Sequence, residues 1–181
     1  MRYLVIVLLA CISFASTAEE SVQTTPTTKI EAFQANTGVV VVRGYTTVGI
    51  LRGLGGDVSV DAREYLDAGN QAKRVTGISI SVKETGRLER ENTSFIDADE
   101  IDSLLQGLDY ISRVSKEITK QENFEAEYRT KGYFKVTVFN DSNGQLSLAI
   151  SSGHIGKTSA YLKMSQIQEL KQLILTAKSK L

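Results

Sequence analysis

The order of hydrophobic and polar residues predicts a run of strands, then a helix, and then the same elements again. Between residues 29 and 97, β-branched residues are frequent and apolar positions alternate with polar ones, which is the period-two pattern of half-buried strands. Ile78, Ile80 and Val82, for example, fall on one face of a predicted strand. From residue 101 to residue 114 apolar side chains instead recur every three or four positions, which predicts an amphipathic helix.

Strands resume in the second half of the chain, which also ends in a helical pattern. Residues 124–162 again alternate between apolar and polar positions, and Asn143-Gly144 separates two of these runs. That dipeptide predicts a tight hairpin. Apolar side chains at helical spacing follow in residues 167–177, with lysines just after them, where the helix dipole favours cations.

The two predicted helices, each with the strand before it, resemble each other in sequence. The stretch "TSFIDADEIDSLLQGL" aligns with "TSAYLKMSQIQELKQLI" when Phe95 is matched to Tyr161. We therefore predict an α+β fold of two related antiparallel sheets, each followed by one amphipathic helix, with units at residues 29–118 and 119–181 packed together. The alternative is that two amphipathic helices resemble each other through composition alone.

This order of elements resembles a known architecture. Tandem units of strands followed by a helix are similar to PUR repeats and to the PC4-like single-stranded-DNA-binding fold, and "TSAYLKMSQIQELKQLI" looks like the last strand and helix of those domains. The resemblance implies a curved antiparallel sheet with a helix on one face. Nucleic-acid binding is only a remote alternative, because the chain departs from those families in its export signal and its neutral charge.

The N-terminus has the pattern of a secretory signal peptide over residues 1–18. Arg2 precedes an apolar run of about a dozen residues, and small residues follow, so cleavage is expected after Ala18. A membrane span needs about 20 apolar residues, so no transmembrane segment is expected in the mature chain. We predict a periplasmic or secreted protein, with a flexible, Thr-rich leader over residues 19–28.

A lipid anchor is the alternative to ordinary secretion. Cys11 is the only cysteine, and the residues before it resemble the lipobox of bacterial lipoproteins. Leu9 stands where a smaller or branched residue is usual, so secretion is preferred. If Cys11 leaves with the signal peptide, the mature chain has no thiol, which excludes disulfides and cysteine nucleophiles.

The composition is that of a globular protein without a strong charge. Hydrophobic residues make up 41% of the chain, and Lys+Arg and Asp+Glu both total 21. No net field would attract nucleic acid or an anionic membrane. The expected partner is therefore an unidentified protein or small ligand, and nucleic acid is not expected.

Four carboxylates in residues 97–102 form the most chemically suggestive run of the chain. An EF-hand loop beginning at Asp97 would need a ligand at its fifth position and Gly at its sixth, where Ile101 and Asp102 stand. A helix start explains the run better, because acidic residues stabilise the first turn. Asp99 is the predicted N-cap, Ser165 takes the same place in the second half, and neither a metal nor a cofactor is expected.

Two glycine-rich stretches and one histidine give only incomplete motifs. Gly156-Lys157-Thr158 ends like a phosphate-binding loop, but Ser151 replaces the first glycine of that motif. A connection between strands is expected there, and the glycines at residues 53–56 are expected to allow a tight turn or a bulge. His154 is the only histidine, and the chain has no G-x-S-x-G nucleophile elbow whose serine it could activate. An exported hydrolase using carboxylates or His154 is therefore the less favoured alternative to a non-enzymatic protein.

The candidate binding surface lies on one predicted strand. Tyr133, Lys135, Thr137 and Phe139 share one of its faces, where aromatic rings and a lysine would offer a stacking or peptide-binding surface. The sequence favours the alternative that the strand is covered on both sides by the other half. The expected function is an exported binding or structural module whose ligand the sequence does not name.

Overall fold

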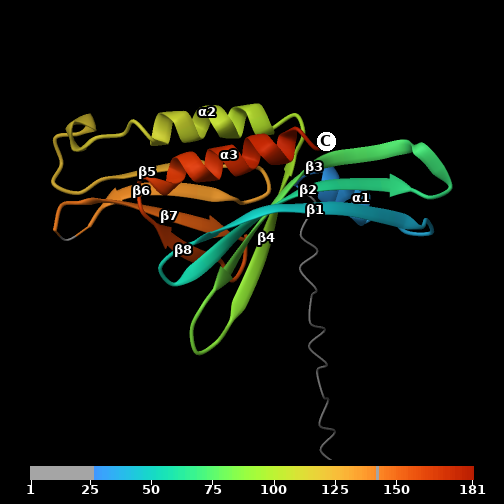
Figure 1. Ribbon diagram of the computed structural model, residues 1–181, viewed down its shortest axis with the longest axis horizontal. Coiled ribbons are helices and arrows are strands. Elements are labelled where there is room, and N and C mark those ends of the chain that lie inside the picture. The colour runs from blue at the N-terminus through green and yellow to red at the C-terminus, as the bar shows by residue number, and fades with distance from the viewer. Residues whose placement is uncertain (1–26, 142) are drawn as a thin grey trace, which may run out of the picture.

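The computed structural model describes residues 27–141 and 143–181 as an α+β fold with two four-stranded antiparallel sheets (Figure 1). The predicted signal peptide, Cys11 and all but the last two residues of the predicted leader lie outside the described residues. No helix in the described part of the chain combines the length and the apolar character that a membrane span requires.

The first sheet has its strands in the order of the chain, β1-β2-β3-β4. The turn between the first two strands is the predicted glycine turn: the Gly53 amide donates to the Gly56 carbonyl at 2.9 Å, and Gly55 has a φ of +77°, a conformation that glycine adopts without strain. The strands are β1 (Val41–Arg52), β2 (Gly56–Asp67), β3 (Asn70–Glu84) and β4 (Arg90–Asp97).

The second sheet repeats this order as β5-β6-β7-β8. The predicted hairpin joins β6 to β7, where Gly144 has a φ of +71° and the Asp141 side chain accepts a hydrogen bond from the Asn143 amide at 2.9 Å. The prediction from Asn143-Gly144 is thus confirmed. The strands are β5 (Glu125–Arg129), β6 (Lys135–Asn140), β7 (Leu146–Ser152) and β8 (Thr158–Leu162).

A helix follows each sheet, but it packs on the sheet of the other half. The helix α2 (Ile101–Ile111) comes after the first sheet and packs on β5 and β6, whereas α3 (Gln166–Lys178) comes after the second sheet and packs on β1 and β2. The two helices lie side by side (Figure 1). A short 3-10 helix, Lys116–Ile118, lies in the connection from α2 to β5.

Two glycines allow this exchange of helices. Gly107 of α2 lies against the ring of Tyr128 in β5, and Gly49 of β1 lies against the side chain of Leu173 in α3. A side chain at either glycine would overlap its neighbour, so each helix approaches the opposite sheet where the backbone carries no side chain. Each helix therefore follows its own sheet, as predicted, but covers the sheet of the other half.

One hydrophobic core joins both halves. The inner faces of the sheets contribute alternate residues of most strands, for example Val58, Val60 and Ala62 of β2, which agrees with the predicted period of two. Buried side chains of α2 and α3 fill the space between them. Fully buried members of this core include Val60, Ile80, Leu104, Val136, Ile150 and Leu170.

The first described element is a helix, α1 (Lys29–Gln34), where the alternating pattern had predicted a strand. A capping box stabilises it: the Thr28 hydroxyl accepts from the Glu31 amide at 3.1 Å, and the Glu31 carboxylate accepts from the Thr28 amide at 3.0 Å. The buried Ile30 side chain lies over Gly77 of β3. The Thr-x-x-Glu spacing is a known signal for a helix start. The sequence still predicted a strand here, because the apolar pattern of a six-residue helix is too short to show a helical period.

Candidate functional site

The carboxylates of the acidic run bind separate parts of the molecule. Asp97, which is buried, accepts hydrogen bonds from the backbone amides of Lys29 and Ile30 at 2.8 and 3.1 Å, and so holds the start of α1. Glu100 accepts from the Lys131 amide at 2.8 Å. The side chains thus diverge toward different partners, and no group of three or more His, Cys, Asp or Glu residues in the described part of the chain is arranged to hold a metal ion.

The predicted cap at Asp99 is wrong by one residue. The Glu100 amide donates to the Asp97 carbonyl at 2.9 Å, which closes a turn before the helix, so Glu100 is the N-cap of α2. The Asp99 carboxylate instead pairs with the Lys29 ammonium at 2.7 Å. That hydrogen bond holds the pKa of Asp99 below its ordinary value.

Ser165 does stand at the N-cap of α3, but its side chain makes no capping hydrogen bond. Its backbone is already helical, with φ −62° and ψ −26°, whereas a capping hydroxyl acts from an extended residue. The Gln166 side chain accepts from the Lys163 amide at 2.9 Å instead.

His154 lies in the loop between β7 and β8, as expected for a connection between strands. It is exposed, and its ring stacks on Tyr133 with the ring centroids 4.1 Å apart. Tyr133 has a φ of +62° and stands in the tight turn that precedes β6. Tyr133 is therefore not on the strand face where the sequence pattern placed it.

The other three members of the candidate surface lie on the outer face of the second sheet. Lys135, Thr137 and Phe139 are partly exposed, while Val136 and Val138 between them are fully buried. The strand is thus covered on one face only, in contrast to the alternative that the sequence favoured.

These three residues line a shallow hollow of about 250 Å³, which we call the sheet-2 trough. Small side chains floor it, because Thr137 pairs with Ala149 across the sheet and Ser151 pairs with Ser159. Its full lining is Glu125, Glu127, Lys135, Thr137, Phe139, Ala149, Ser151, Lys157, Ser159 and Tyr161.

Two aromatic rings stand together at one side of the trough. Phe139 and Tyr161 meet edge to face with their centroids 6.4 Å apart, and Tyr161 is 49% exposed. Tyr161 is opposite Ala149 in the register of the sheet. The small alanine side chain therefore leaves the aromatic pair open toward the floor, where a flat ligand has room to stack.

Charged residues line the other side of the trough. Glu127 forms ion pairs with Lys135 at 3.3 Å and with Arg129 at 2.8 Å. Burial raises the pKa of Glu127, but hydrogen bonds from Arg129 and Lys135 outweigh it and hold that pKa below its ordinary value. Glu127 is therefore an ionised acceptor at neutral pH, placed beside a lysine donor.

The floor of the trough is braced by the first sheet. The Ser159 amide donates to the Glu84 carboxylate at 3.0 Å, and Glu84 in turn pairs with Arg90 at 2.6 Å. The Arg90 side chain and the Ser159 amide together lower the pKa of Glu84. The hydroxyls of Ser151 and Ser159 are 3.0 Å apart, so the polar floor is fixed by contacts on both sides.

Sequence reasoning missed the residues that β7 and β8 add to the trough. The alternation of these strands gives the face on which Ala149 and Tyr161 lie, but only the order of the strands in the sheet places that face beside β6. Nothing in the spacing along the chain predicts the contact between Phe139 and Tyr161.

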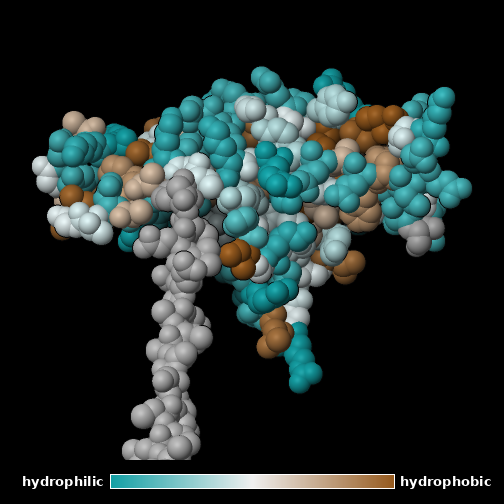
Figure 2. All heavy atoms as spheres, turned by 180° about the vertical axis from the view of Figure 1, so that it is seen from behind, coloured by the Kyte–Doolittle hydropathy of each residue, from teal (hydrophilic) through white to brown (hydrophobic). Residues whose placement is uncertain are grey.

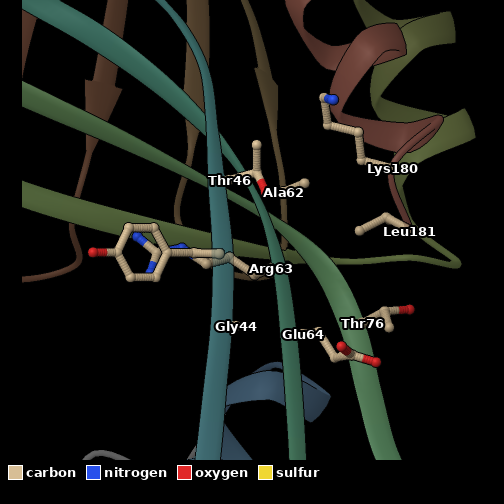
Figure 3. A pocket seen from close by; sticks show the side chains of 9 residues that line it. Gly44, Thr46, Ala62, Arg63, Glu64, Thr76, Lys180 and Leu181 are labelled. Atoms are coloured by element: carbon tan, nitrogen blue, oxygen red, sulfur yellow. The ribbon is translucent and has the colours of Figure 1, made fainter.

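A second hollow, of about 300 Å³, lies at the first sheet (Figure 3). Glu64 and Thr76 lie on the same side of the strands as Lys180 and Leu181, while Arg63 points to the other side of β1. The Arg63 guanidinium is occupied there by hydrogen bonds to Asp61 at 2.6 Å and to Ser79 at 2.8 Å. This hollow lacks the adjoining aromatic pair of the sheet-2 trough, so it is the weaker candidate.

The chain matches no protein-family model, and no curated protein shows significant sequence similarity to it. The functional conclusion therefore depends on the geometry of the described residues.

Proposed function

We propose that this protein is an exported, non-enzymatic binding module that holds a neutral, hydroxyl-rich ring, such as a pyranose sugar, in the sheet-2 trough. The observation that carries the proposal is the aromatic pair of Phe139 and Tyr161 beside a floor of small and hydroxyl-bearing side chains. Ligand sites of this kind combine an apolar stacking surface with a few placed polar groups.

The polar groups of the trough favour a ligand that both donates and accepts hydrogen bonds. Thr137, Ser151 and Ser159 have hydroxyls that can do either, whereas the lysines only donate and the ionised glutamates only accept. Lys135 and Lys157 are balanced by two glutamates, Glu125 and Glu127. A phosphate or a nucleic acid would meet those carboxylates, so a neutral ligand fits the charge pattern better.

The expected export of the chain supports the same proposal, because a signal peptide over residues 1–18 would place the trough where extracellular glycans occur. The ordinary composition of the mature chain, without a thiol, suits a secreted binding module.

The internal duplication predicted from the sequence belongs to this proposal too. When Phe95 is aligned with Tyr161, the buried positions of the two helices coincide: Ile101 with Ile167, and Leu104 with Leu170. We take residues 29–118 and 119–181 as related units, and the proposed ligand trough lies in the second. In the first unit α1 lies against β3 and β4 and covers part of the outer face.

Binding is tested by titrating the isotope-labelled protein with N-acetylglucosamine and with glucose, each as the monomer and as short oligomers, and following backbone amide shifts. A monosaccharide has about 12 heavy atoms, so a dissociation constant of about 1 mM is expected. The shifts should centre on β6, β7 and β8. The Tyr161→Ala variant should lose binding, since it removes an exposed ring while keeping the backbone of the strand.

The matched control is Tyr110→Ala, which removes a tyrosine of similar exposure on α2. Equal loss of binding in both variants, or shifts confined to the hollow near Lys180, would contradict the proposal. A titration with a single-stranded oligonucleotide tests the remote nucleic-acid alternative, because binding through phosphate would weaken steeply with added salt.

A further inference from the structure

The strand β1 presents a long, uncovered sheet edge. It spans 12 residues, and within the described residues it pairs with β2 alone. Its side chains and those just before it are exposed although several are apolar: the exposed fraction is 67% for Tyr45, 70% for Val40 and 44% for Val42. Figure 2 shows hydrophobic atoms gathered in separate patches on the rear face of the molecule, including both of its ends.

The other sheet edges are protected. Beyond β8, the amide of Leu54 donates to the Tyr161 carbonyl at 2.8 Å and the Tyr161 amide donates back at 3.0 Å. Along β4, the chain at Gly132 lies directly against the backbone of Phe95. β5 has only five residues, three of them charged. Short length, charge and coverage are the usual defences of an edge strand, whereas residues 41–47 of β1 are long enough to pair, carry a single charge at Arg43 and are not covered on this edge by any described residue.

The first part of β1 is also regular enough to accept another strand. Residues 41–47 pair with β2 in an unbroken register, and the bulge at Val48 interrupts the pairing only after them. Within this segment, Arg43 is the single charged residue. Gly44 lies near the middle, and the space beside it is open, with the closest side-chain atom 3.8 Å from where a Cβ would stand.

We propose that a second copy of this chain pairs with β1 along residues 41–47 in antiparallel fashion, centred on Gly44, so that the first sheets of two copies form one eight-stranded sheet. The segment is complementary to itself in this register. Arg43 of one copy lies opposite Tyr45 of the other and Val42 lies opposite Thr46, so no like charges meet and each residue faces one on the same side of the sheet.

The contact at Tyr45 favours a second copy over an unrelated strand. The Arg63 guanidinium of the same copy already lies 4.8 Å from the centroid of the Tyr45 ring. Arg43 of the second copy would reach the other side of this ring, where a cation is attracted by the aromatic face. The hollow of Figure 3 runs along the inner side of the same segment, between β1 and the end of α3. A strand added to the edge of β1 would close this hollow on that side.

The oligomeric state is measured by sedimentation velocity over a range of concentrations. We expect the wild type to shift from monomer toward dimer, and the Val42→Lys/Tyr45→Lys variant to associate at least about tenfold more weakly. Leu88→Lys is the matched control, because Leu88 is 79% exposed in the turn between β3 and β4. A wild type that stays monomeric, or a dimer that both variants retain, would overturn the proposal.

The register is tested in a chain that also carries Cys11→Ser. A cysteine at the centre of an antiparallel pair faces itself, so Gly44→Cys should form a disulfide-linked dimer under mild oxidation. Leu88→Cys should stay monomeric in the same conditions. Thermal melting checks that both variants fold. Equal crosslinking of the two, or fast crosslinking of Thr46→Cys in place of Gly44→Cys, would refute this register.

Discussion

At the scale of single residues, the acidic run shows how carboxylates close together in sequence serve different purposes. Asp97 satisfies two amides at the start of α1, Glu100 accepts from the loop before β6, and Asp102 pairs with Lys178 of α3. Side chains that point to three different elements cannot converge on one cation. The run therefore stabilises the junction between the first helix, the second sheet and the last helix.

Asp97→Ala should destabilise the protein by about 1–3 kcal/mol, because it leaves the part-buried Lys29 amide and the buried Ile30 amide at the start of α1 without their acceptor. Urea unfolding measures the free-energy difference. Asp99→Ala is the control two residues away, and it should cost clearly less, since its pair with Lys29 is exposed to solvent. A larger loss for Asp99→Ala would mean that Asp99 holds the helix start.

The ionisation of Glu127 should make the free energy of unfolding depend on pH, and the direction of its pKa shift fixes the sign. Its pKa is lower in the folded protein than its ordinary value, so its ion pairs contribute stability fully above the ordinary pKa, and that contribution is lost as the pH falls through the lowered one. Unfolding at a series of pH values should show a smaller acid-side loss for Glu127→Gln than for the wild type. A carboxyl shift in NMR that titrates at or above the ordinary glutamate value would contradict this.

At the scale of elements, the exchanged helices explain the glycines inside α2 and β1. Glycine in a helix is about 1 kcal/mol less favourable than alanine, so its presence in α2 needs a structural reason. The ring of Tyr128 supplies one, since it lies where the Cβ of residue 107 would stand.

Gly107→Ala should therefore destabilise the protein, against the helix propensity of alanine, by about 1–3 kcal/mol of overpacking. In a protein that already carries Tyr128→Ala the ring is absent, so Gly107→Ala should cost less stability there than it does in the wild type. A double-mutant cycle from chemical denaturation gives the coupling. Additive effects of the two changes would show that α2 does not press on β5.

At the scale of the whole molecule, the two halves share one core, so they should unfold together. Sheet one is covered by α3 and sheet two by α2, so neither half buries its inner face alone. A chain ending at residue 118 would leave the inner face of β1 and β2 without its helix.

We expect one cooperative unfolding transition. Fluorescence of a Trp introduced at Phe139 would report the second half, one at Tyr45 would report the first, and circular dichroism would report both. The three urea midpoints should coincide. Separate midpoints for the two tryptophans would show independent domains instead.

The sequence predicts local structure well where a pattern is long and poorly where contacts join distant segments. The alternation in β3, the hairpin at Asn143-Gly144 and the stripe of α2 lead directly to the observed elements. Helix α1 was missed because six residues are too few for a periodic pattern. Of the proposed site, Lys135, Thr137 and Phe139 follow from alternation, whereas Tyr161 joins them only through the order of strands in the sheet.

The exchange of helices also sets an order for the synthesis of the chain. Strand β1 is made early, but the helix that covers it is made after residue 165. More than half of the chain lies between the end of β1 at Arg52 and the start of α3 at Gln166, and it must be made before the inner face of β1 can be covered. Contacts between such distant segments make folding slow, and in the meantime the long edge of β1 is open to wrong partners. Until α3 is available, contacts with other chains therefore compete with the folding of the first sheet.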